Sequence, residues 1–471
     1  MARVSNILTR FMSDRRGNFA ILTGAALSML AVGAGFGVNT AQLMNTKSAL
    51  QNALDAAVAS TARDLTTGVI AEADARASVE TFLIANGGGA FAREGAVTLE
   101  TLTVDRTART VAATAKANID LAFPLFGAEK TRDVAATTAA LYADRRIEVA
   151  MMLDVTGSMA GQKIRDLKSA ATNAVNALLG SQDPRNPRVR VSIVPYAEAV
   201  NVGTLASPSV IFQERRGASD LPPYVGASAR YVSDNTGSFA DNCATERKLP
   251  DLSPDYSDAS PMTLREYPGD PSRKFYARIN RDDRLDTKDC PKAPIVPLTA
   301  DADALKRSIN AFNAVGYTAG SIGIQWTQYM LSPKWRDTIR NARLGAGPAD
   351  ADPQDVGKIA ILMTDGQFNT VFAGGDSRLG VNSQGRAARN TAEALCDRMK
   401  ADGIEIFTIG FDLDNRSIPA QDRRDAKAVL NACASDDTGT IKHYFEASTG
   451  PELDAAFQEI ISNTERLFLT M

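Results

Sequence analysis

The chain has 471 residues, of which 44% are hydrophobic and 23% charged, and its formal net charge is −3. This composition is that of a globular protein with about two to three domains, and the acidic balance argues against nucleic-acid binding, which usually leaves a basic footprint. The single histidine, His443, excludes zinc sites that need two or more imidazoles. We interpret His443 as a strand or loop residue beside Tyr444 and Phe445.

An uncharged apolar segment near the N-terminus predicts a membrane anchor. No charged residue occurs from Gly17 to Thr46, and residues 19–38 form a largely apolar run. As a helix, this run spans about 30 Å, the thickness of the hydrocarbon core of a bilayer. Four arginines and only one acidic residue precede it. The positive-inside rule therefore predicts that residues 1–18 are cytoplasmic and that the chain after the apolar run lies on the opposite side of the membrane.

Two alternatives remain for this segment. A cleavable signal peptide has a shorter apolar region that ends at a small-residue cleavage site, and a buried helix of a soluble domain is the other possibility. The run here is long and continues into a helical pattern without an obvious break, which favours an uncleaved transmembrane helix at 19–38.

Residues 39–89 predict a helical stalk that ends at the glycine run 87–89. A mostly apolar stripe recurs at helical spacings through Leu43, Leu50, Leu54, Val58, Thr61 and Leu65. A long helix with one apolar face needs a partner surface, which is either the next domain or another protein.

Residues 90–143 predict a small β-rich module. Apolar and polar residues alternate over 97–104 and again over 110–112, and a polar turn at 105–107 separates the two runs. This alternation is typical of strands.

Residues 144–471 predict an α/β domain with a mainly parallel sheet. Apolar runs that indicate buried strands occur at 147–153, 189–194, 358–363 and 404–409. Helical segments are expected at 161–179, 385–401, 421–433 and 451–466. Strands that alternate with helices at this spacing define the α/β class.

The stretch 203–298 interrupts this alternation and is too long for an ordinary connection, so we interpret it as an insertion. The four cysteines, Cys243, Cys290, Cys396 and Cys433, contain no C-x-x-C pair, and an even number in an exported domain predicts two disulfides. Sequence order suggests 243 with 290 and 396 with 433, although three connectivities are possible. Four buried free thiols are the alternative for a cytosolic domain.

Oxygen-bearing side chains follow two of the predicted strands. Asp154, Thr156 and Ser158 come at the end of the first buried strand, and Asp365 follows another central strand. Thr318 lies between them, in a loop that enters a helix. Ligands of open α/β sheets bind beyond the carboxyl ends of strands, and these donors suit a hard cation such as Mg²⁺ or Ca²⁺. A helix cap and turn is the alternative role of the two hydroxyls of the first loop.

These five residues resemble the metal-ion-dependent adhesion site of von Willebrand factor A (VWA) domains, which usually reads Asp-x-Ser-x-Ser, with a Thr and an Asp from later loops. Here Thr156 stands where Ser is usual. The resemblance implies a VWA fold, a Rossmann-like α/β domain, and a divalent metal, most simply Mg²⁺, with Ca²⁺ or Mn²⁺ as alternatives. It implies that the hydroxyls hold the metal and that the Asp residues act largely through water. One coordination position is then left for an Asp or Glu carboxylate of a protein partner.

A second resemblance concerns both ends of the chain and the VWA core. Residues 15–18, 50–57, 364–370 and 444–460 are similar to the TadG-type proteins of Flp (tight-adherence) pilus assembly. That family implies a single-pass protein of the bacterial inner membrane with most of its chain in the periplasm. It also implies a role in pilus assembly, anchoring or surface adhesion, with a pilus-assembly component as partner.

We therefore expect a protein that is not an enzyme. A general envelope adhesion or stress-sensing VWA protein is one alternative. A metal-dependent hydrolase, in which Asp154 and Asp365 hold a catalytic Mg²⁺, is another, but no phosphate-cradling G-x-x-x-x-G-K-[ST] motif and no obvious general base occur. Asp154→Ala is expected to abolish partner binding without unfolding the domain, on the premise that Asp154 is an exposed site residue.

Overall fold

The computed structural model describes residues 18–67, 69–87, 97–105, 108–124, 130–142, 146–180, 182, 187–207, 209–214, 224–225, 241–350 and 355–469. Outside them lie residues 1–17 of the expected cytoplasmic segment, residues 88–89 at the end of the expected stalk, turn residues 106–107, and much of 208–240 in the expected insertion. The chain divides into two compact units: Met1–Thr66 with Ile70–Asp144, and Arg145–Met471 with Thr67–Val69.

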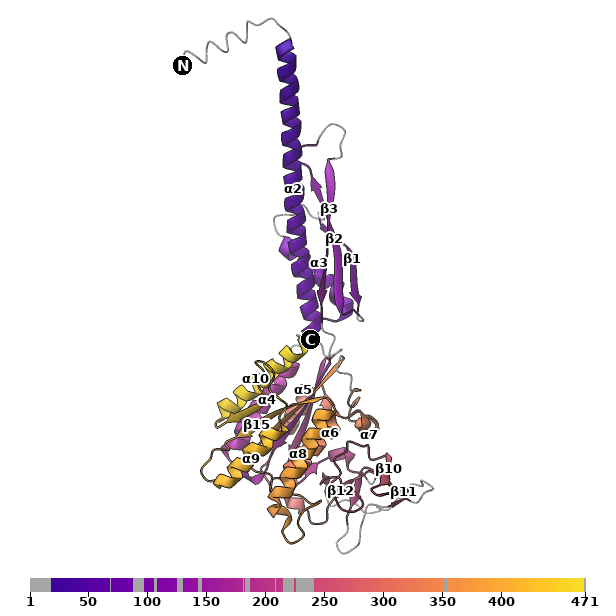
Figure 1. Cartoon of the computed structure of the whole chain (residues 1–471), viewed down its shortest axis with the longest axis vertical. Helices are drawn as coiled ribbons and strands as arrows, with labels where there is room; N and C mark the ends of the chain where they lie inside the picture. Colours follow the sequence, from indigo (N-terminus) through magenta and orange to yellow (C-terminus); the bar gives the residue numbers. More distant parts are fainter. Residues whose placement is uncertain are drawn as a thin grey trace. The chain divides into compact units, whose positions relative to one another are not determined.

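The first unit is built on one long helix, α2 (Asn18–Thr67) (Figure 1). Its apolar part is long enough and hydrophobic enough to cross a membrane, with a mean hydropathy of 1.8. Large apolar side chains on it are exposed, including Ile21, Leu27 and Met29. Exposed apolar surface of this extent marks a membrane or protein contact.

The helical stretch expected as far as residue 89 is broken. Helix α2 ends at Thr67, a short 3₁₀ turn η1 (Glu72–Asp74) follows, and α3 (Ala75–Gly87) completes the segment. The sequence Thr66-Thr67-Gly68 explains the end of α2, because β-branched residues and glycine are poor helix formers.

A three-stranded antiparallel sheet packs on α2 and α3. Its strands, in the order β1-β2-β3, are β1 (Val97–Asp105), β2 (Thr110–Asp120) and β3 (Thr131–Leu141). The helical stripe and one face of β2 form one hydrophobic core, which includes Leu50, Leu54, Val58, Leu65, Val111, Ala113, Ala115 and Ala117. The β-rich segment is therefore the partner surface of the stalk, the first of the two alternatives given by the sequence.

The second unit is a doubly wound α/β domain (Figure 1). Among the described residues, its main sheet has eight strands. Five of them run parallel, namely β5 (Val189–Tyr196), β4 (Arg146–Asp154), β14 (Val356–Thr364), β15 (Ile404–Phe411) and β16 (Tyr444–Ala447), whereas β13 (Val296–Thr299), β6 (Val200–Asn201) and β9 (Cys243–Ala244) pair antiparallel at the β5 edge. Without β6 and β9, the strands lie side by side as β13-β5-β4-β14-β15-β16. Read in that spatial sequence, the strand order is 3-2-1-4-5-6, and such sheets bind ligands where the order reverses. That point lies between β4 and β14.

Helices cover both faces of this sheet. One core joins β4 to α4 (Gln162–Leu179), α5 (Ala302–Asn310) and α10 (Gly450–Leu469). The other core joins β4 to α6 (Gly320–Leu331), α8 (Gly385–Ala401) and α9 (Ala420–Cys433), and the short α7 (Arg336–Asn341) contributes Ile339 to it. Side chains of β4 alternate between the two cores, as expected of a strand buried on both faces. The mixed α/β class predicted from the sequence is confirmed.

The stretch 203–298 has its own short strands: β7 (Ile211–Gln213), β8 (Tyr224–Val225), β9 (Cys243–Ala244), β10 (Leu264–Tyr267), β11 (Asp270–Tyr276) and β12 (Ile279–Arg281). Strands β10, β11 and β8 form one small sheet, and β12 pairs with β7. Strand β9 instead extends the main sheet through β6 (Val200–Asn201), and β13 begins before the stretch ends. Both ends of the segment are thus anchored on the main sheet.

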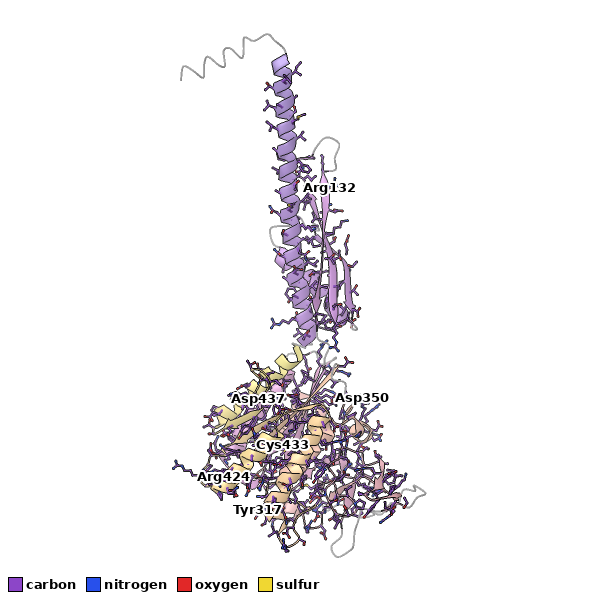
Figure 2. All side chains as sticks on the ribbon, in the orientation of Figure 1. Arg132, Tyr317, Asp350, Arg424, Cys433 and Asp437 are labelled. Atoms are coloured by element: carbon purple, nitrogen blue, oxygen red, sulfur yellow. A yellow bond between two sulfur atoms is a disulfide. The ribbon has the colours of Figure 1, made fainter. Side chains whose placement is uncertain are left out.

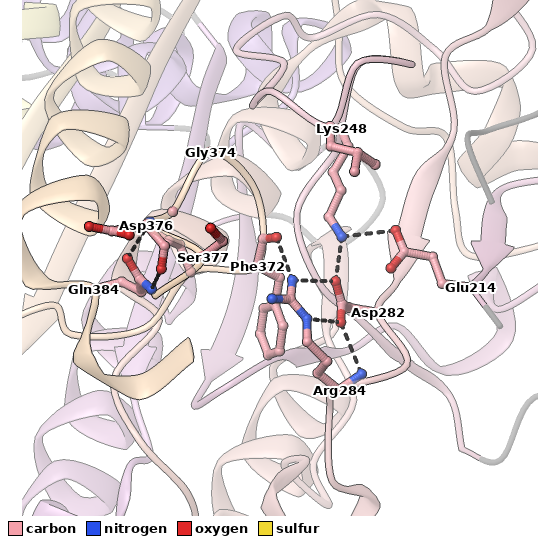
Figure 3. Close-up of a pocket in the computed structure, with 12 residues that line it drawn as sticks. Glu214, Lys248, Asp282, Arg284, Phe372, Gly374, Asp376, Ser377 and Gln384 are labelled. Carbon is pink, nitrogen blue, oxygen red and sulfur yellow. Dashed lines mark hydrogen bonds and ion pairs between the residues drawn. The ribbon is translucent and has the colours of Figure 1, made fainter. Parts of the chain in front are cut away.

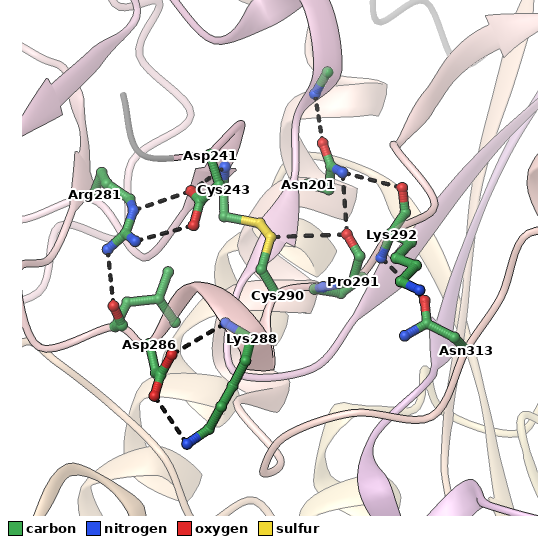
Figure 4. The surroundings of a disulfide bond; sticks show 12 residues. Asn201, Asp241, Cys243, Arg281, Asp286, Lys288, Cys290, Pro291, Lys292 and Asn313 are labelled. Atoms are coloured by element: carbon green, nitrogen blue, oxygen red, sulfur yellow. Dashed lines mark hydrogen bonds and ion pairs between the residues drawn. A yellow bond between two sulfur atoms is a disulfide. The ribbon is translucent and has the colours of Figure 1, made fainter. Parts of the chain in front are cut away.

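All four cysteines are paired in the structure. Cys243 bonds to Cys290, with Cα atoms 6.2 Å apart, and ties β9 to the loop before β13 (Figure 4). Cys396 of α8 bonds to Cys433 at the end of α9, with Cα atoms 5.1 Å apart. These are the pairings that sequence order suggested.

The disulfides give the first testable result. Thiol labelling of the purified, denatured protein is expected to find no free cysteine, because both disulfides are formed in the structure and the expected export would place them in an oxidising compartment. Reduction before labelling is the control and should expose four thiols. Four thiols that react without reduction would contradict the exported topology.

Candidate metal centre

The predicted site lies where β4 and β14 end side by side. The two strands are parallel, with Met152 opposite Leu362, so Asp154 and Asp365 leave the sheet at the same edge. The loop after β4 turns through the 3₁₀ segment η3 (Gly157–Met159), and the Gly157 N–H donates to the Gly316 carbonyl at 3.0 Å. That bond brings the first loop against the loop that carries Thr318.

Four of the five predicted residues form one hydrogen-bonded chain. Thr156 donates to Asp154 Oδ1 from its backbone N–H at 2.9 Å and from its hydroxyl at 2.6 Å. The hydroxyls of Thr156 and Ser158 lie 2.9 Å apart, and Ser158 donates to Asp365 Oδ1 at 2.6 Å. Two hydroxyls and two carboxylates from distant parts of the sequence thus meet at the switch point of the sheet.

Asp154 is fully buried, and the premise that it is an exposed site residue is wrong. Its Oδ2 accepts hydrogen bonds from the Tyr196 hydroxyl at 2.8 Å and the Thr364 hydroxyl at 2.7 Å. The physical reason is its place in the fold: it ends a central strand between β5 and β14, so both neighbouring strands supply donors. Asp154 is thus held by hydrogen bonds inside the domain, whereas Ser158 is exposed to solvent.

Thr318 is joined to the loop that follows Asp365. Its backbone N–H donates to Asn369 Oδ1 at 3.1 Å, and its carbonyl accepts from the Asn369 N–H at 3.0 Å. Among the described residues, no hydrogen bond links the Thr318 side chain to the other four predicted residues. Tyr317, the neighbour labelled in Figure 2, is 53% exposed and marks this loop at the surface.

Lys163 is a site residue that the sequence did not reveal. Its Nζ lies 3.0 Å from Asp365 Oδ2 and 3.1 Å from Asp412 Oδ2. Burial raises the pKa of Asp365 to about 6, as does the Asp154 charge, against the opposing effect of Lys163. Burial lowers the pKa of Lys163, but the two carboxylates outweigh it and leave that pKa above its ordinary value. The sequence could have indicated this residue, because Lys163 lies in the first turn of the helix that follows the Asp154–Ser158 loop.

The donors at this site fit a hard divalent cation. Oxygen donors are the ligands that Mg²⁺ and Ca²⁺ prefer, and Ser158 is an exposed residue, so the site lies near the surface. The ion pair between Lys163 and Asp365 places an ammonium group beside the site, and its positive charge opposes a metal cation there.

Two other acidic groups of the second unit are explained without a metal. Asp241 lies beside Cys243 and Cys290, but both sulfurs are used in a disulfide (Figure 4). The second group is Glu214, Asp282 and Asp283, of which Glu214 and Asp282 line a pocket of about 310 Å³ (Figure 3). There, Lys248 donates hydrogen bonds to Glu214 and Asp282, and two nitrogens of Arg284 donate to Asp282. The positive charges of these side chains therefore already neutralise Glu214 and Asp282.

Comparison with known families identifies the N-terminal part of the chain. Residues 17–64 match the family described as putative Flp pilus-assembly TadE/G-like. The matched segment contains most of α2, including the apolar stretch and much of the helical stripe. The resemblance to TadG-type proteins of Flp pilus assembly is therefore confirmed over this segment. No curated protein matches the chain.

Several solved structures are similar at low identity. The pilus adhesin SpaC from Lactobacillus rhamnosus GG is 12% identical over 79% of this chain, which spans only 35% of that protein, with a TM-score of 0.35. The vWF domain of the type V pili tip protein Mfa5 from Porphyromonas gingivalis is 13% identical over 69% of this chain and 97% of that domain, with a TM-score of 0.37. Proximal thread matrix protein 1 from the mussel byssus, with a zinc-occupied MIDAS motif, is 13% identical over 68% of this chain and 46% of its own, with a TM-score of 0.29.

Proposed function

We propose that this chain is a membrane-anchored envelope protein whose α/β unit is a VWA domain that binds a protein partner through a divalent metal. The metal, most simply Mg²⁺, is held by Thr156, Ser158 and Thr318, with Asp154 and Asp365 behind them. The partner supplies an Asp or Glu carboxylate and is a component of Flp-type pilus assembly, anchoring or adhesion. The match of residues 17–64 supports the pilus context.

The observation that carries this proposal is the hydrogen-bonded chain from Asp154 through Thr156 and Ser158 to Asp365. It places two hydroxyl oxygens at the carboxyl edge of a doubly wound sheet, where ligands of such sheets bind. A helix cap does not explain this arrangement, because Ser158 reaches a carboxylate that lies 207 positions away in the sequence rather than its own helix.

Each residue of the site has a separate task. A bound cation supplies a Lewis-acidic position that accepts a carboxylate oxygen from outside. Ser158 and Thr156 present neutral oxygens, so they hold the cation without cancelling its charge. Asp154 fixes the Thr156 hydroxyl by accepting from it, and Asp365 does the same for Ser158. A site that holds its metal largely with neutral oxygens keeps it attractive to the incoming carboxylate.

The exported orientation of the second unit is part of the proposal. The arginines before the apolar helix favour a cytoplasmic N-terminus, and the two disulfides suit the periplasm. A helix of this length and hydropathy then anchors the chain in the inner membrane.

A general envelope VWA protein is the alternative that shares this site, and the partner distinguishes it from a pilus protein. A hydrolase is disfavoured because it lacks an assignable base. His443, the single histidine of the chain, is fully buried, with its ring stacked 4.6 Å from that of Phe407 and Nε2 2.7 Å from Glu405 near the start of β15. That is the opposite end of the strand from the proposed site. Lys163, the other candidate base, is held in ion pairs with two carboxylates and therefore stays protonated.

Metal binding tests the proposal directly. Titration of the full-length chain in detergent with Mg²⁺ in a calorimeter is expected to show one site, and Ser158→Ala is expected to weaken it by about tenfold or more. Ser272→Ala is the matched control, because the Ser272 hydroxyl also donates to a carboxylate at 2.6 Å but lies on the β10–β11 hairpin. Equal binding by all three proteins, or none by the wild type, would refute the metal site.

A further inference from the structure

Lys163 bridges the ends of two neighbouring strands. It is the second residue of α4, the helix that follows the Asp154–Ser158 loop, and its ammonium group lies between Asp365, after β14, and Asp412, after β15. The lysine side chain is only 21% exposed, so this ion pair is shielded from bulk water more than a surface pair is.

Asp412 is itself held in place. Its backbone adopts the left-handed region, with φ 54°, and its N–H donates to the Ala447 carbonyl at 2.7 Å. The Asn415 amide donates to the same Oδ2 atom that faces Lys163, at 2.9 Å. An aspartate in this strained conformation persists only where its surroundings fix it. The position of the Lys163 ammonium group is therefore fixed by an aspartate that is itself fixed.

The two oxygens of Asp365 have different partners. Oδ1 accepts from Ser158 and faces the hydroxyls of the proposed metal site, whereas Oδ2 is bound to Lys163. A carboxylate held on both sides cannot turn to offer both oxygens to one cation. The ammonium group also repels a divalent cation bound at the hydroxyls of Thr156 and Ser158, because two positive charges repel more strongly where water is partly excluded.

We propose that Lys163 is a positioning residue that limits Asp365 to one metal-facing oxygen and lowers the affinity of the site for its cation, so that the bound cation stays open to a partner's carboxylate. This inference rests on the proposed function and adds the residue that sets the balance between metal affinity and partner affinity. In this arrangement, Lys163 acts through Asp365 and does not touch the cation.

A purely structural role for Lys163 predicts the opposite result. If Lys163 only joined α4 to the loops after β14 and β15, its loss would loosen these loops and weaken metal binding. If it limits Asp365, its loss leaves two carboxylates without their counter-charge, and metal binding becomes tighter.

The test uses the full-length chain and Mn²⁺, whose electron paramagnetic resonance and effect on water-proton relaxation report affinity and the number of bound waters. Lys163→Met is expected to bind Mn²⁺ about tenfold more tightly, with fewer bound waters, because Asp365 becomes a direct ligand. Lys163→Arg keeps the charge and should resemble the wild type. Lys168→Met is the matched control on the same helix, since that lysine donates to the Asn310 carbonyl, away from the site.

Unchanged or weaker binding by Lys163→Met, with an unaltered water number, would overturn the inference while leaving the metal site intact. Binding by Lys163→Met but not by the wild type would support it, because the lysine would then oppose the cation outright. No binding by either protein would overturn both proposals. Thermal unfolding of each variant checks its folding, and Lys163→Gln replaces Lys163→Met if the latter does not fold.

Discussion

Replacing Asp154 by alanine is expected to lower the free energy of unfolding of the α/β unit by about 3 kcal/mol or more. Its carboxylate accepts from the hydroxyls of Thr156, Tyr196 and Thr364 in a fully buried position. Each buried donor left without a partner costs about 1–3 kcal/mol. Burial, followed by the Asp154 charge, raises the pKa of Tyr196 well above its ordinary value, so this hydroxyl remains a donor at neutral pH.

Chemical denaturation followed by tryptophan fluorescence measures this effect. The only two tryptophans, Trp326 and Trp335, are both fully buried in the α/β unit and report on it alone. Ser158→Ala is the comparison, and we expect it to cost less than about 1 kcal/mol because the side chain is exposed. An Asp154→Ala protein as stable as the wild type would contradict the hydrogen-bond arrangement described above.

Asp154 has a structural role as well as its place in the proposed metal site. Loss of partner binding by an Asp154→Ala protein would report loosened strand ends as much as a lost metal contact. The exposed Ser158 hydroxyl separates the two effects, since its removal leaves the donors around Asp154 satisfied.

The central strands and several helices could be predicted from the sequence. The apolar runs at 147–153 and 358–363 lie inside β4 and β14, and the helix predicted at 385–401 has the bounds of α8. Continuous apolar runs identify strands buried on both faces, and helical periodicity identifies amphipathic helices. A helix was predicted after the loop at 316–320, and α6 begins there, but its periodicity gave no bounds because all of its residues are buried and no polar face marks its period.

Features that depend on distant residues could not be predicted. Gly320 is one example: a Cβ there would lie 2.0 Å from Phe368 Cε1, so only glycine lets the Thr318 loop approach the loop after Asp365. The burial of Asp154 and the ion pair of Lys163 with Asp365, 202 positions apart, are of the same kind. Residue types and spacing predict which donors follow a strand, but not which neighbouring strands surround them.

The short strands of 203–298 escaped prediction for a different reason. Most are two to four residues long, which is too short for alternation to be recognised. Strands β7, β8, β9 and β12 pair with strands distant in the sequence, and the Cys243–Cys290 bond ties β9 to the loop before β13, whereas β10 and β11 form a local hairpin.

The central claim, that a metal at Ser158 holds a partner's carboxylate, is tested most directly by a pull-down. Full-length wild type and Ser158→Ala, immobilised in detergent, are exposed to envelope extract with Mg²⁺ or with EDTA. We predict a protein retained only by the wild type with Mg²⁺, and its retention is lost when one of its Asp or Glu residues is changed to the amide. The same proteins retained under all four conditions would contradict the claim and would make the α/β unit a scaffold, with binding left to the stalk or to residues 203–298.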